Sequence, residues 1–362
     1  MISLRSISFN LLWYVNLLSA FLLMLSYSAP FVSPMQNSWL AMLALGYPFL
    51  LLINLFWIGF WFYKKSRAVY GSLLTVVMGC GYISTLFGFG GEGDVPRDAL
   101  RLMTYNVRYF NSPLSSKEDK WMESQIEILE YIKFQSPDLL FGQEFSGKGR
   151  ASSNRADEIL KSFGLSHQHR GGKSSLAIYS KFPLEKTGVI YFEGSANGAI
   201  HADVQLPGRK VRVYSVHLQS TRLGNDANEV LKKDNLKTLN KKETQEKYYR
   251  IEEKLSNAFQ MRAAQAAILS EHIAASPYPV IVCGDFNDTP LSFSYRLMSK
   301  GLKDSFTEKG WGLGTTYAGA LPALRIDYIL VDKKIKIHTH KRQSTAISDH
   351  YALTSDVSFK NP

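Results

Sequence analysis

Six short segments of the sequence hold side chains that could do chemistry together. These segments are Thr104-Tyr105-Asn106, Gln143-Glu144, Ser215-Val216-His217-Leu218, Gly284-Asp285-Phe286-Asn287, Arg325-Ile326-Asp327-Tyr328 and Ser348-Asp349-His350. Glu144 and Asp349 offer hard carboxylate oxygens, which suit Mg²⁺ or Mn²⁺ rather than zinc, and Asn106 adds a neutral oxygen. His217 and His350 can donate to a phosphate oxygen, and they gain charge most easily near neutral pH.

Two more carboxylates complete the set. Asp285 stands two residues before Asn287, so a carboxylate and an orienting amide share one segment. Asp327 can hold one imidazole in a single tautomer. A divalent metal, a base and cationic donors suit phosphoryl transfer, because a water must attack phosphorus while negative charge develops on oxygen. Each segment alone is a weak signal, whereas the ordered set is too specific to be accidental.

The elements that must position these side chains follow from the hydrophobic pattern after Leu100. Period-two and short apolar runs predict strands over Arg101–Asn106, Asp138–Gln143, Ser175–Tyr179, Thr187–Phe192, Gly198–Gln205, Lys210–His217, Val280–Cys283, Ile326–Val331 and Leu353–Ser358. Amphipathic patterns predict helices over Met122–Phe134, Ala156–Phe163 and Asn257–Ala275. Because many strands follow one another directly, the pattern favours an α/β sandwich of two or four layers over a doubly wound sheet. The six segments lie beside strand ends, where such a sheet gathers side chains.

This ordered set resembles the endonuclease/exonuclease/phosphatase superfamily, which includes DNase I-like nucleases, abasic-site endonucleases, neutral sphingomyelinases and inositol polyphosphate 5-phosphatases. The resemblance covers about Leu100 to Phe359. Gly284–Asn287 and Ser348–His350, with Gln143-Glu144 upstream, are specific for the superfamily but not for one member. The resemblance implies a four-layered α/β sandwich (DNase I-like). It also implies a Mg²⁺- or Mn²⁺-dependent hydrolase that acts on a phosphodiester or phosphomonoester.

The resemblance also implies which residues bind the metal. Glu144 resembles the main metal-binding carboxylate of the superfamily, with Asn106 beside it. Asp349 resembles a second carboxylate on the metal side. Whether one or two metal ions act is left open.

The remaining roles are implied in the same way. Asp285 resembles the residue that activates or orients the attacking water, and Asn287 resembles a residue that positions phosphate and water. His350 resembles the histidine that contacts the scissile phosphate, with Asp327 as its orienting partner. His217 matches a strand-end histidine of the DNase-like and sphingomyelinase-like branches. Abasic endonucleases usually lack that histidine, so this match disfavours a pure abasic endonuclease.

The first ninety residues have a different composition from the rest of the chain, with four basic residues and no acidic one. Three apolar stretches, at about 7–29, 39–62 and 69–87, are long enough to cross the roughly 30 Å of bilayer hydrocarbon. The first is too long for the apolar core of a typical signal peptide, and two more follow it. We therefore predict a three-helix transmembrane region over residues 1–90 and an integral, multi-pass membrane protein.

The orientation of this region follows from its basic residues. Lys64–Arg67 is the basic cluster of a short loop between two predicted spans, and the loop before it carries no Lys or Arg. The positive-inside rule places such a cluster in the cytoplasm. The chain after the third span, and with it the catalytic domain, is then predicted to be extracytoplasmic.

The rest of the chain divides into a linker and one domain. Residues 91–98 are the predicted linker, and residues 99–362 are the predicted catalytic domain. Residues 221–258 form a charged insert with nine basic and seven acidic residues. Two interpretations stay open for this insert: a solvated helical excursion, or an arm that gates the substrate or faces the membrane.

Composition limits the possible functions. The hydrophobic content of 45% excludes a wholly disordered chain, and two cysteines are too few for a disulfide scaffold or a cysteine zinc site. Residues 91–362 hold 38 basic and 31 acidic residues, and this net charge of +7 permits contact with a nucleic-acid backbone, but no motif of interleaved aromatic and basic residues stands out. The phosphoester substrate is therefore left as a lipid head group, a small phosphoester or a nucleic acid. A non-catalytic binding module is disfavoured by the complete motifs, and no protein partner is inferred.

Substrate specificity is predicted to lie in Gly171–Ser175, the charged insert and Trp311–Tyr317. Trp311 and Tyr317 lie close in sequence to the Asp327 segment. Either they stack on a ring of the substrate, or they pack against the edge of the sheet.

Overall fold

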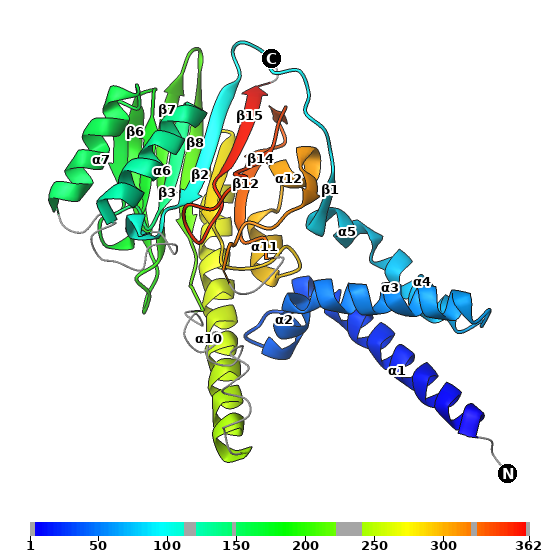
Figure 1. Cartoon of the computed structure of the whole chain (residues 1–362). Coiled ribbons are helices and arrows are strands. Elements are labelled where there is room, and N and C mark those ends of the chain that lie inside the picture. The colour runs from blue at the N-terminus through cyan, green and yellow to red at the C-terminus, as the bar shows by residue number, and fades with distance from the viewer. Residues whose placement is uncertain (1–3, 112–120, 147–149, 222–240, 320–323, 360–362) are drawn as a thin grey trace.

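A computed structural model of the chain describes residues 4–111, 121–146, 150–221, 241–319 and 324–359. Beyond Leu100 the chain forms two β-sheets that pack face to face (Figure 1). The first sheet has six strands, in the order β10 (Leu302–Asp304), β12 (Asp327–Asp332), β9 (Val280–Asp285), β8 (Arg209–His217), β7 (Gly198–Leu206) and β6 (Leu184–Tyr191). The second sheet has seven, in the order β13 (Ile335–Ile337), β15 (Leu353–Phe359), β2 (Leu100–Asn106), β3 (Leu139–Gln143), β5 (Ala177–Ser180) and β4 (His167–Arg170), with β14 (Lys341–Arg342) also paired to β15.

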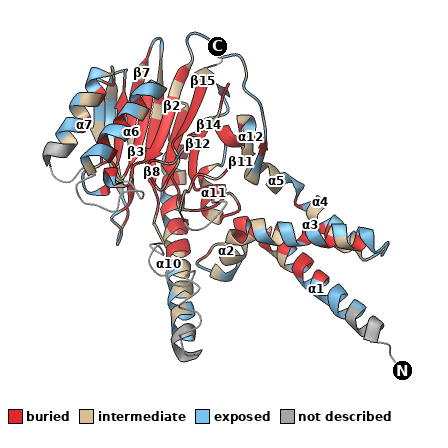
Figure 2. Ribbon diagram, in the orientation of Figure 1, coloured by how far each residue is buried: buried red, intermediate tan, exposed pale blue. Residues whose placement is uncertain are grey.

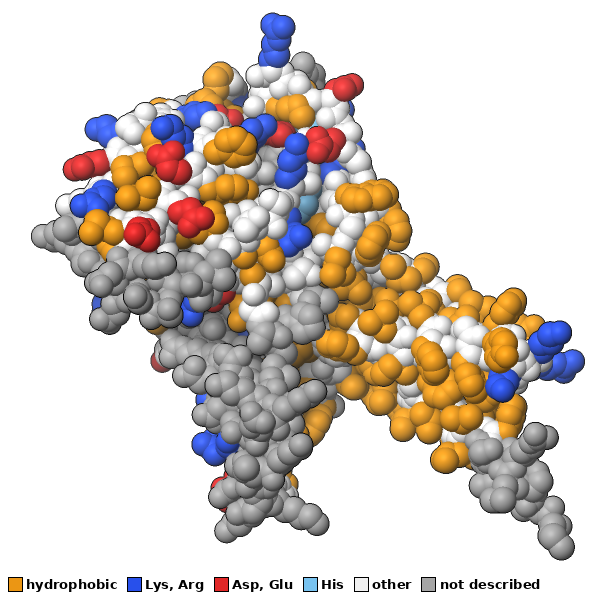
Figure 3. Space-filling view, viewed as in Figure 1, with side chains coloured by type: hydrophobic (Ala, Val, Ile, Leu, Met, Phe, Trp, Pro, Cys, Tyr) orange, Lys and Arg blue, Asp and Glu red, His pale blue; other side chains and the backbone are white. Residues whose placement is uncertain are grey.

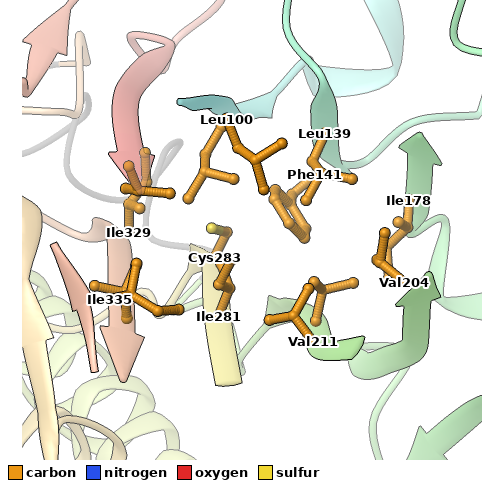
Figure 4. Close-up of a cluster of buried hydrophobic side chains, with 14 of the residues drawn as sticks. Leu100, Leu139, Phe141, Ile178, Val204, Val211, Ile281, Cys283, Ile329 and Ile335 are labelled. Atoms are coloured by element: carbon orange, nitrogen blue, oxygen red, sulfur yellow. The ribbon is translucent and has the colours of Figure 1, made fainter. Parts of the chain in front are cut away.

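The main hydrophobic core lies between the two sheets. Alternate residues of each strand point to the same face, so every second side chain enters this layer. Figure 4 shows Leu139, Phe141 and Ile178 of the second sheet facing Val211 and other side chains of the first. These side chains are fully buried.

Helices cover both outer faces, and the buried residues concentrate on the sheets between them (Figure 2). Helices α6 (Trp121–Gln135) and α7 (Arg150–Ser162) cover the second sheet, where Ile128 and Ile132 of α6 pack with Leu140. Helices α10 (Lys241–Ala274) and α11 (Phe293–Met298) cover the first sheet, where Leu269 of α10 packs with Val216. The predicted α/β sandwich is confirmed, with a helix layer on each side of the sheet pair.

Two elements, α10 and β9, extend further than the sequence predicts. Residues 241–258 of the charged insert are helical: α10 starts at Lys241 and continues unbroken through the helix predicted from Asn257. Its first half projects away from the sheets (Figure 1). Residues 222–240 of the insert lie outside the described residues. Strand β9 runs two residues further than predicted and ends at Asp285.

The N-terminal region consists of apolar helices, namely α1 (Leu4–Ser26), η1 (Ala29–Phe31), α2 (Ser38–Leu45), α3 (Tyr47–Tyr63), α4 (Val69–Met78) and α5 (Cys80–Leu86). One helical segment, Phe9–Phe31, is long and apolar enough to cross a membrane by itself. The other two predicted spans are broken: α2 and α3 meet at 60°, and α4 and α5 meet at 66°. Pro48 lies in the first turn of α3, where a residue without an N–H removes no hydrogen bond from the helix.

Buried polar side chains join three of these helices. Asn16 of α1 accepts a hydrogen bond from Trp61 Nε1 of α3 at 2.8 Å and donates to Ser72 Oγ of α4 at 2.5 Å. Ser72 in turn donates to Asn54 Oδ1 of α3 at 2.9 Å. All four side chains are buried. Hydrogen bonds between buried polar side chains stabilise the packing of apolar helices whose surroundings are equally apolar. These contacts join α1, α3 and α4 into one bundle.

The helices dock directly onto the sandwich. The strand β1 (Phe87–Phe89), which follows α5, pairs antiparallel with β11 (Trp311–Leu313) of the domain. Arg325 Nε donates to the carbonyl oxygen of Thr85 in α5 at 3.0 Å. Leu291, six residues after Asp285, packs in the cluster that includes Leu23 and Tyr47. The apolar helices and the domain therefore contact each other directly and are not joined by the linker alone.

Candidate active site

The pairing register of the first sheet brings three of the predicted residues together. Strand β9 lies between β8, which is parallel to it, and β12, which is antiparallel. In this register Asp285 of β9 is opposite both His217 of β8 and Asp327 of β12. Residues at directly opposite positions project to the same face of a sheet, so a carboxylate stands between a histidine and a second carboxylate.

The second sheet contributes from the facing strand ends. Asn106 ends β2 and Glu144 follows β3, and these two strands are parallel neighbours. The Asn106 Nδ2 donates to Asp285 Oδ2 at 3.0 Å, which links the two sheets at this edge. Glu144 Oε1 lies 3.9 Å from His217 Nε2. Strand ends that are far apart in the sequence thus meet at one edge of the sandwich.

Both histidines face the same carboxylate oxygen. His217 Nε2 lies 3.6 Å and His350 Nε2 lies 3.7 Å from Asp285 Oδ2. The other ring nitrogen of His350, Nδ1, is 2.9 Å from Asp327 Oδ2. Asp327 therefore accepts the Nδ1–H bond and leaves Nε2 of His350 directed at the site.

The last two predicted residues lie at the rim of this cluster. Asp349 Oδ2 is 3.4 Å from Arg108 Nε, and its side chain is partly exposed. The backbone N–H of Asn287 donates to Asp285 Oδ1 at 2.8 Å, and its side-chain amide donates to the Leu218 carbonyl oxygen at 3.1 Å. Asn287 thus orients Asp285 and ties two loops together. All eight predicted residues lie at the same edge of the sandwich.

Burial and neighbouring charges set the protonation states. Burial, reinforced by the charge of Asp285, raises the pKa of Glu144 to about 7. Burial also raises the pKa of Asp285, against the opposing charge of His350. Burial lowers the pKa of His217. Burial alone would lower the pKa of His350 too, but Asp327 and Asp285 outweigh it and raise that pKa to about 10. At neutral pH the site thus pairs a neutral His217 with a cationic His350, a division that suits acid–base chemistry.

The donor set also fits a hard divalent cation. Among the described residues, a group of potential ligands within 4.8 Å of one another comprises Asp285, Asp327 and His350. These three are already hydrogen-bonded to one another or to Asn106. Glu144 is different, because its charge is disfavoured by burial and by Asp285 and Asp349. A cation beside this carboxylate would relieve those penalties.

A left-handed stretch of backbone beside the site was not predicted from the sequence. Arg108, Tyr109 and Phe110 have successive φ values of 47°, 54° and 59°, a left-handed run that costs about 1–3 kcal/mol per residue. This run directs Arg108 toward Asp349. Only the position of Arg108 two residues after Asn106 could have drawn attention to it.

The region around Tyr317 also supports the site. The Tyr317 ring lies 5.4 Å from the His350 ring, at 70° to it. Thr316 Oγ1 accepts hydrogen bonds from the backbone N–H groups of Ile326 and Asp327. Tyr317 thus contacts the ring of His350 rather than the edge of a sheet, and stacking of its ring on a substrate stays a prediction.

Comparison with known proteins agrees with this architecture. Residues 103–350 match the model of the Endonuclease/Exonuclease/phosphatase family. Residues 9–86 match a domain of unknown function. A search of curated proteins found no match.

Solved structures show the same fold at low sequence identity. The structure of an endonuclease/exonuclease/phosphatase from Beutenbergia cavernae DSM 12333 is 17% identical with a TM-score of 0.51, covering 73% of this chain and 72% of that chain. The human Nocturnin catalytic domain with bound sulfate is 19% identical with a TM-score of 0.52, covering 74% of this chain and 97% of that chain. At such identities the likeness shows the fold alone. The family match over residues 103–350 goes further, because it spans most of the chain and every predicted site residue. This chain belongs to the endonuclease/exonuclease/phosphatase family, whose members are hydrolases of phosphoester bonds.

Proposed function

We propose that this chain is a membrane-anchored, divalent-metal-dependent phosphoesterase that hydrolyses a phosphodiester or phosphomonoester by in-line attack of water. The observation that carries the proposal is the convergence of Asn106, His217 and His350 on one oxygen of Asp285. A buried carboxylate held between a neutral and a cationic histidine can take a proton from water while charge develops on phosphate oxygens.

Asp285 is the residue that activates the water in this proposal. Asn106 holds its Oδ2 and the Asn287 N–H holds its Oδ1, so the carboxylate keeps one orientation. Its raised pKa makes it a better proton acceptor than an exposed aspartate. A fixed orientation also reduces the reorganisation needed to reach the transition state.

The two histidines serve the phosphate. His350 is held by Asp327 and is cationic at neutral pH, so its Nε2–H can donate to a phosphate oxygen as charge accumulates there. His217 offers a second ring from the neighbouring strand, on the Glu144 side of the site. Loss of one such donor costs about 2.7–4 kcal/mol of transition-state stabilisation in comparable sites.

Glu144, Asn106 and Asp349 would hold Mg²⁺ or Mn²⁺ at the open side of this cluster. When bound, the cation supplies charge neutralisation at a phosphoryl or leaving oxygen. Their carboxylate and amide oxygens are the ligands that such cations prefer.

The N-terminal helices serve as the anchor in this proposal. Each bent pair is taken as one broken span, which together with Phe9–Phe31 makes three. Phe56 and Leu74 are each 63% exposed on apolar helices, an arrangement that suits lipid rather than water. The basic segment Lys64–Arg67 is then cytoplasmic and the catalytic domain extracytoplasmic.

The test is a hydrolysis assay on the purified full chain in lipid nanodiscs with Mg²⁺. Separate reactions contain plasmid DNA, RNA, sphingomyelin-type vesicles, glycerophospholipid vesicles and a small chromogenic phosphodiester. Asp285→Ala and EDTA are the negative controls, and Glu130→Gln, an exposed change on α6, is the matched control. We expect EDTA-sensitive hydrolysis of at least one substrate by the unchanged chain and by Glu130→Gln. A folded chain that hydrolyses none of them would refute the proposal.

A further inference from the structure

The two-stranded ribbon of β1 and β11 exposes large apolar side chains on one face. Trp311 is 76% exposed, Phe89 is 68%, Leu313 is 48% and Phe87 is 39%. In the pairing register Phe87 is opposite Leu313 and Phe89 is opposite Trp311, so the four side chains lie on the same face. The Phe87 and Phe89 rings are themselves 5.2 Å apart. We call this set the ribbon face.

The opposite face of the ribbon is fixed against the domain. Gly88 is opposite Gly312 in the register. A Cβ atom on Gly88 would lie 2.3 Å from the carbonyl oxygen of Gly310, so only glycine permits this close approach. The backbone N–H of Gly90 also donates to that oxygen, at 2.8 Å. Because Gly88 is pressed onto the Gly310 backbone on this face, larger side chains cannot be accommodated there, and the four apolar side chains remain exposed on the other face at the cost of contact with water.

The ribbon face continues the apolar surface of the N-terminal helices. Phe87 directly follows α5, and residues Ala68–Gly91 contain no charged side chain. Figures 1 and 2 show β1 and β11 on the flank of the domain where α5 meets it. Figure 3 shows hydrophobic side chains over that flank and over the adjoining helices. Contiguous apolar surface of this extent marks an interaction site, and aromatic side chains are enriched where protein meets the bilayer interface.

We propose that the ribbon face lies in the interfacial zone of a phospholipid bilayer. The inference rests on the membrane anchoring proposed above, and it adds a contact made by the catalytic domain itself. Its consequence is a fixed tilt of the domain on the membrane, because the helices and the ribbon hold it at separate points. The same segment leads from Trp311 to Tyr317, which packs against His350. The rim of the site is thereby held close to the lipid surface.

Site-directed spin labelling of the full chain in nanodiscs tests this contact. Exposed Cys80 is first replaced by Ser, and Cys283, which is buried, is retained. Single cysteines are then introduced as Phe89→Cys and Trp311→Cys. Tyr191→Cys, 63% exposed on β6 at the edge of the first sheet, is the matched control on the domain. Phe56→Cys on α3 reports on the anchor. Each label is probed for collisions with oxygen, which partitions into lipid, and with a nickel chelate, which stays in water.

We expect the ratio of oxygen to nickel accessibility to be several-fold higher for the labels at 89 and 311 than for the label at 191. Equal ratios at 89, 311 and 191, with a high ratio at 56, would overturn the ribbon contact while leaving the anchor intact. Low accessibility of 89 and 311 to both reagents would also overturn it, since a second copy of the chain would then cover this face. A low ratio at 56 would instead refute the membrane anchoring. Retained elution volume and near-ultraviolet circular dichroism check that each variant is folded.

Discussion

At the scale of single residues, the site is organised around one oxygen atom, Asp285 Oδ2. It accepts a hydrogen bond from Asn106 and faces Nε2 of both His217 and His350. Types and spacing in the sequence identified all of these residues as candidates. They did not show which of them is central, because that depends on the register between β8, β9 and β12.

Removing either partner of the central contact should abolish most activity while the fold is kept. We expect His350→Ala to lower kcat/KM by about 10²–10³-fold, the loss typical of a donor to a developing oxyanion. Asp285→Ala should cost at least as much, because it removes the proton acceptor. Steady-state kinetics on the substrate identified in the assay above measures both. Near-normal turnover in either variant would remove the assignment, and a native near-ultraviolet circular dichroism spectrum at the assay temperature would show that the loss is not one of folding.

The pH dependence of stability should report the His350–Asp327 pair. The pKa of His350 rises from its ordinary 6.5 to about 10 in the folded chain. A histidine whose pKa is higher in the folded chain than in the unfolded chain stabilises the fold fully at pH values below its unfolded pKa. This stabilisation is lost as the pH rises through its pKa in the folded chain. The melting temperature of the metal-free chain should therefore fall between about pH 6.5 and 10. His350→Gln should flatten this decline, and identical curves for the two proteins would contradict the assigned shift.

At the scale of elements, the segment before β12 links that strand to helix α5. Arg325 is buried two residues before Asp327, and its Nη1 lies 2.6 Å from Asp304 Oδ2. Its Nε donates to the Thr85 carbonyl oxygen of α5, and its guanidinium lies 4.7 Å from the centre of the Phe306 ring. One side chain thus connects α5, α12 (Ser305–Lys309) and β12.

Replacing Arg325 should destabilise the chain strongly. Arg325→Met leaves Asp304 buried without its partner, which typically costs about 3–5 kcal/mol. The matched control is Arg342→Met on β14, an exposed side chain whose guanidinium lies 4.2 Å from the centre of the Tyr351 ring, and the expected change there is about 1 kcal/mol or less. Thermal unfolding in detergent compares the two. Equal, small shifts in both variants would show that the contact contributes little.

At the scale of the whole molecule, the apolar helices and the sandwich behave as one structure in the described residues. Strand β1, Leu291 and Arg325 all cross the boundary between them. The interface includes Leu291, so the N-terminal helices contact the loop that follows β9.

Removing the boundary strand should therefore weaken the domain. We expect a fragment of residues 91–362 to melt at a lower temperature than one of residues 85–362. The shorter fragment lacks the partner of β11 and the Thr85 carbonyl oxygen that Arg325 binds. Scanning calorimetry of both fragments in the same detergent measures the difference. If the shorter fragment were equally stable, β1 would be a peripheral strand.

The sequence by itself identified the family, the candidate site residues and most of the architecture. Residue types identify Glu144, Asp285 and His350 as candidates, and periodicity predicts the long strands and the apolar helices, because both are properties of neighbouring residues. The tertiary structure alone decided the rest. The register that sets Asp285 opposite His217, the left-handed run that brings Arg108 to Asp349, and the pairing of β1 with β11 all depend on contacts between distant segments. Short strands such as β1 and β11 owe their existence to such a partner rather than to local propensity, so local patterns could not predict them.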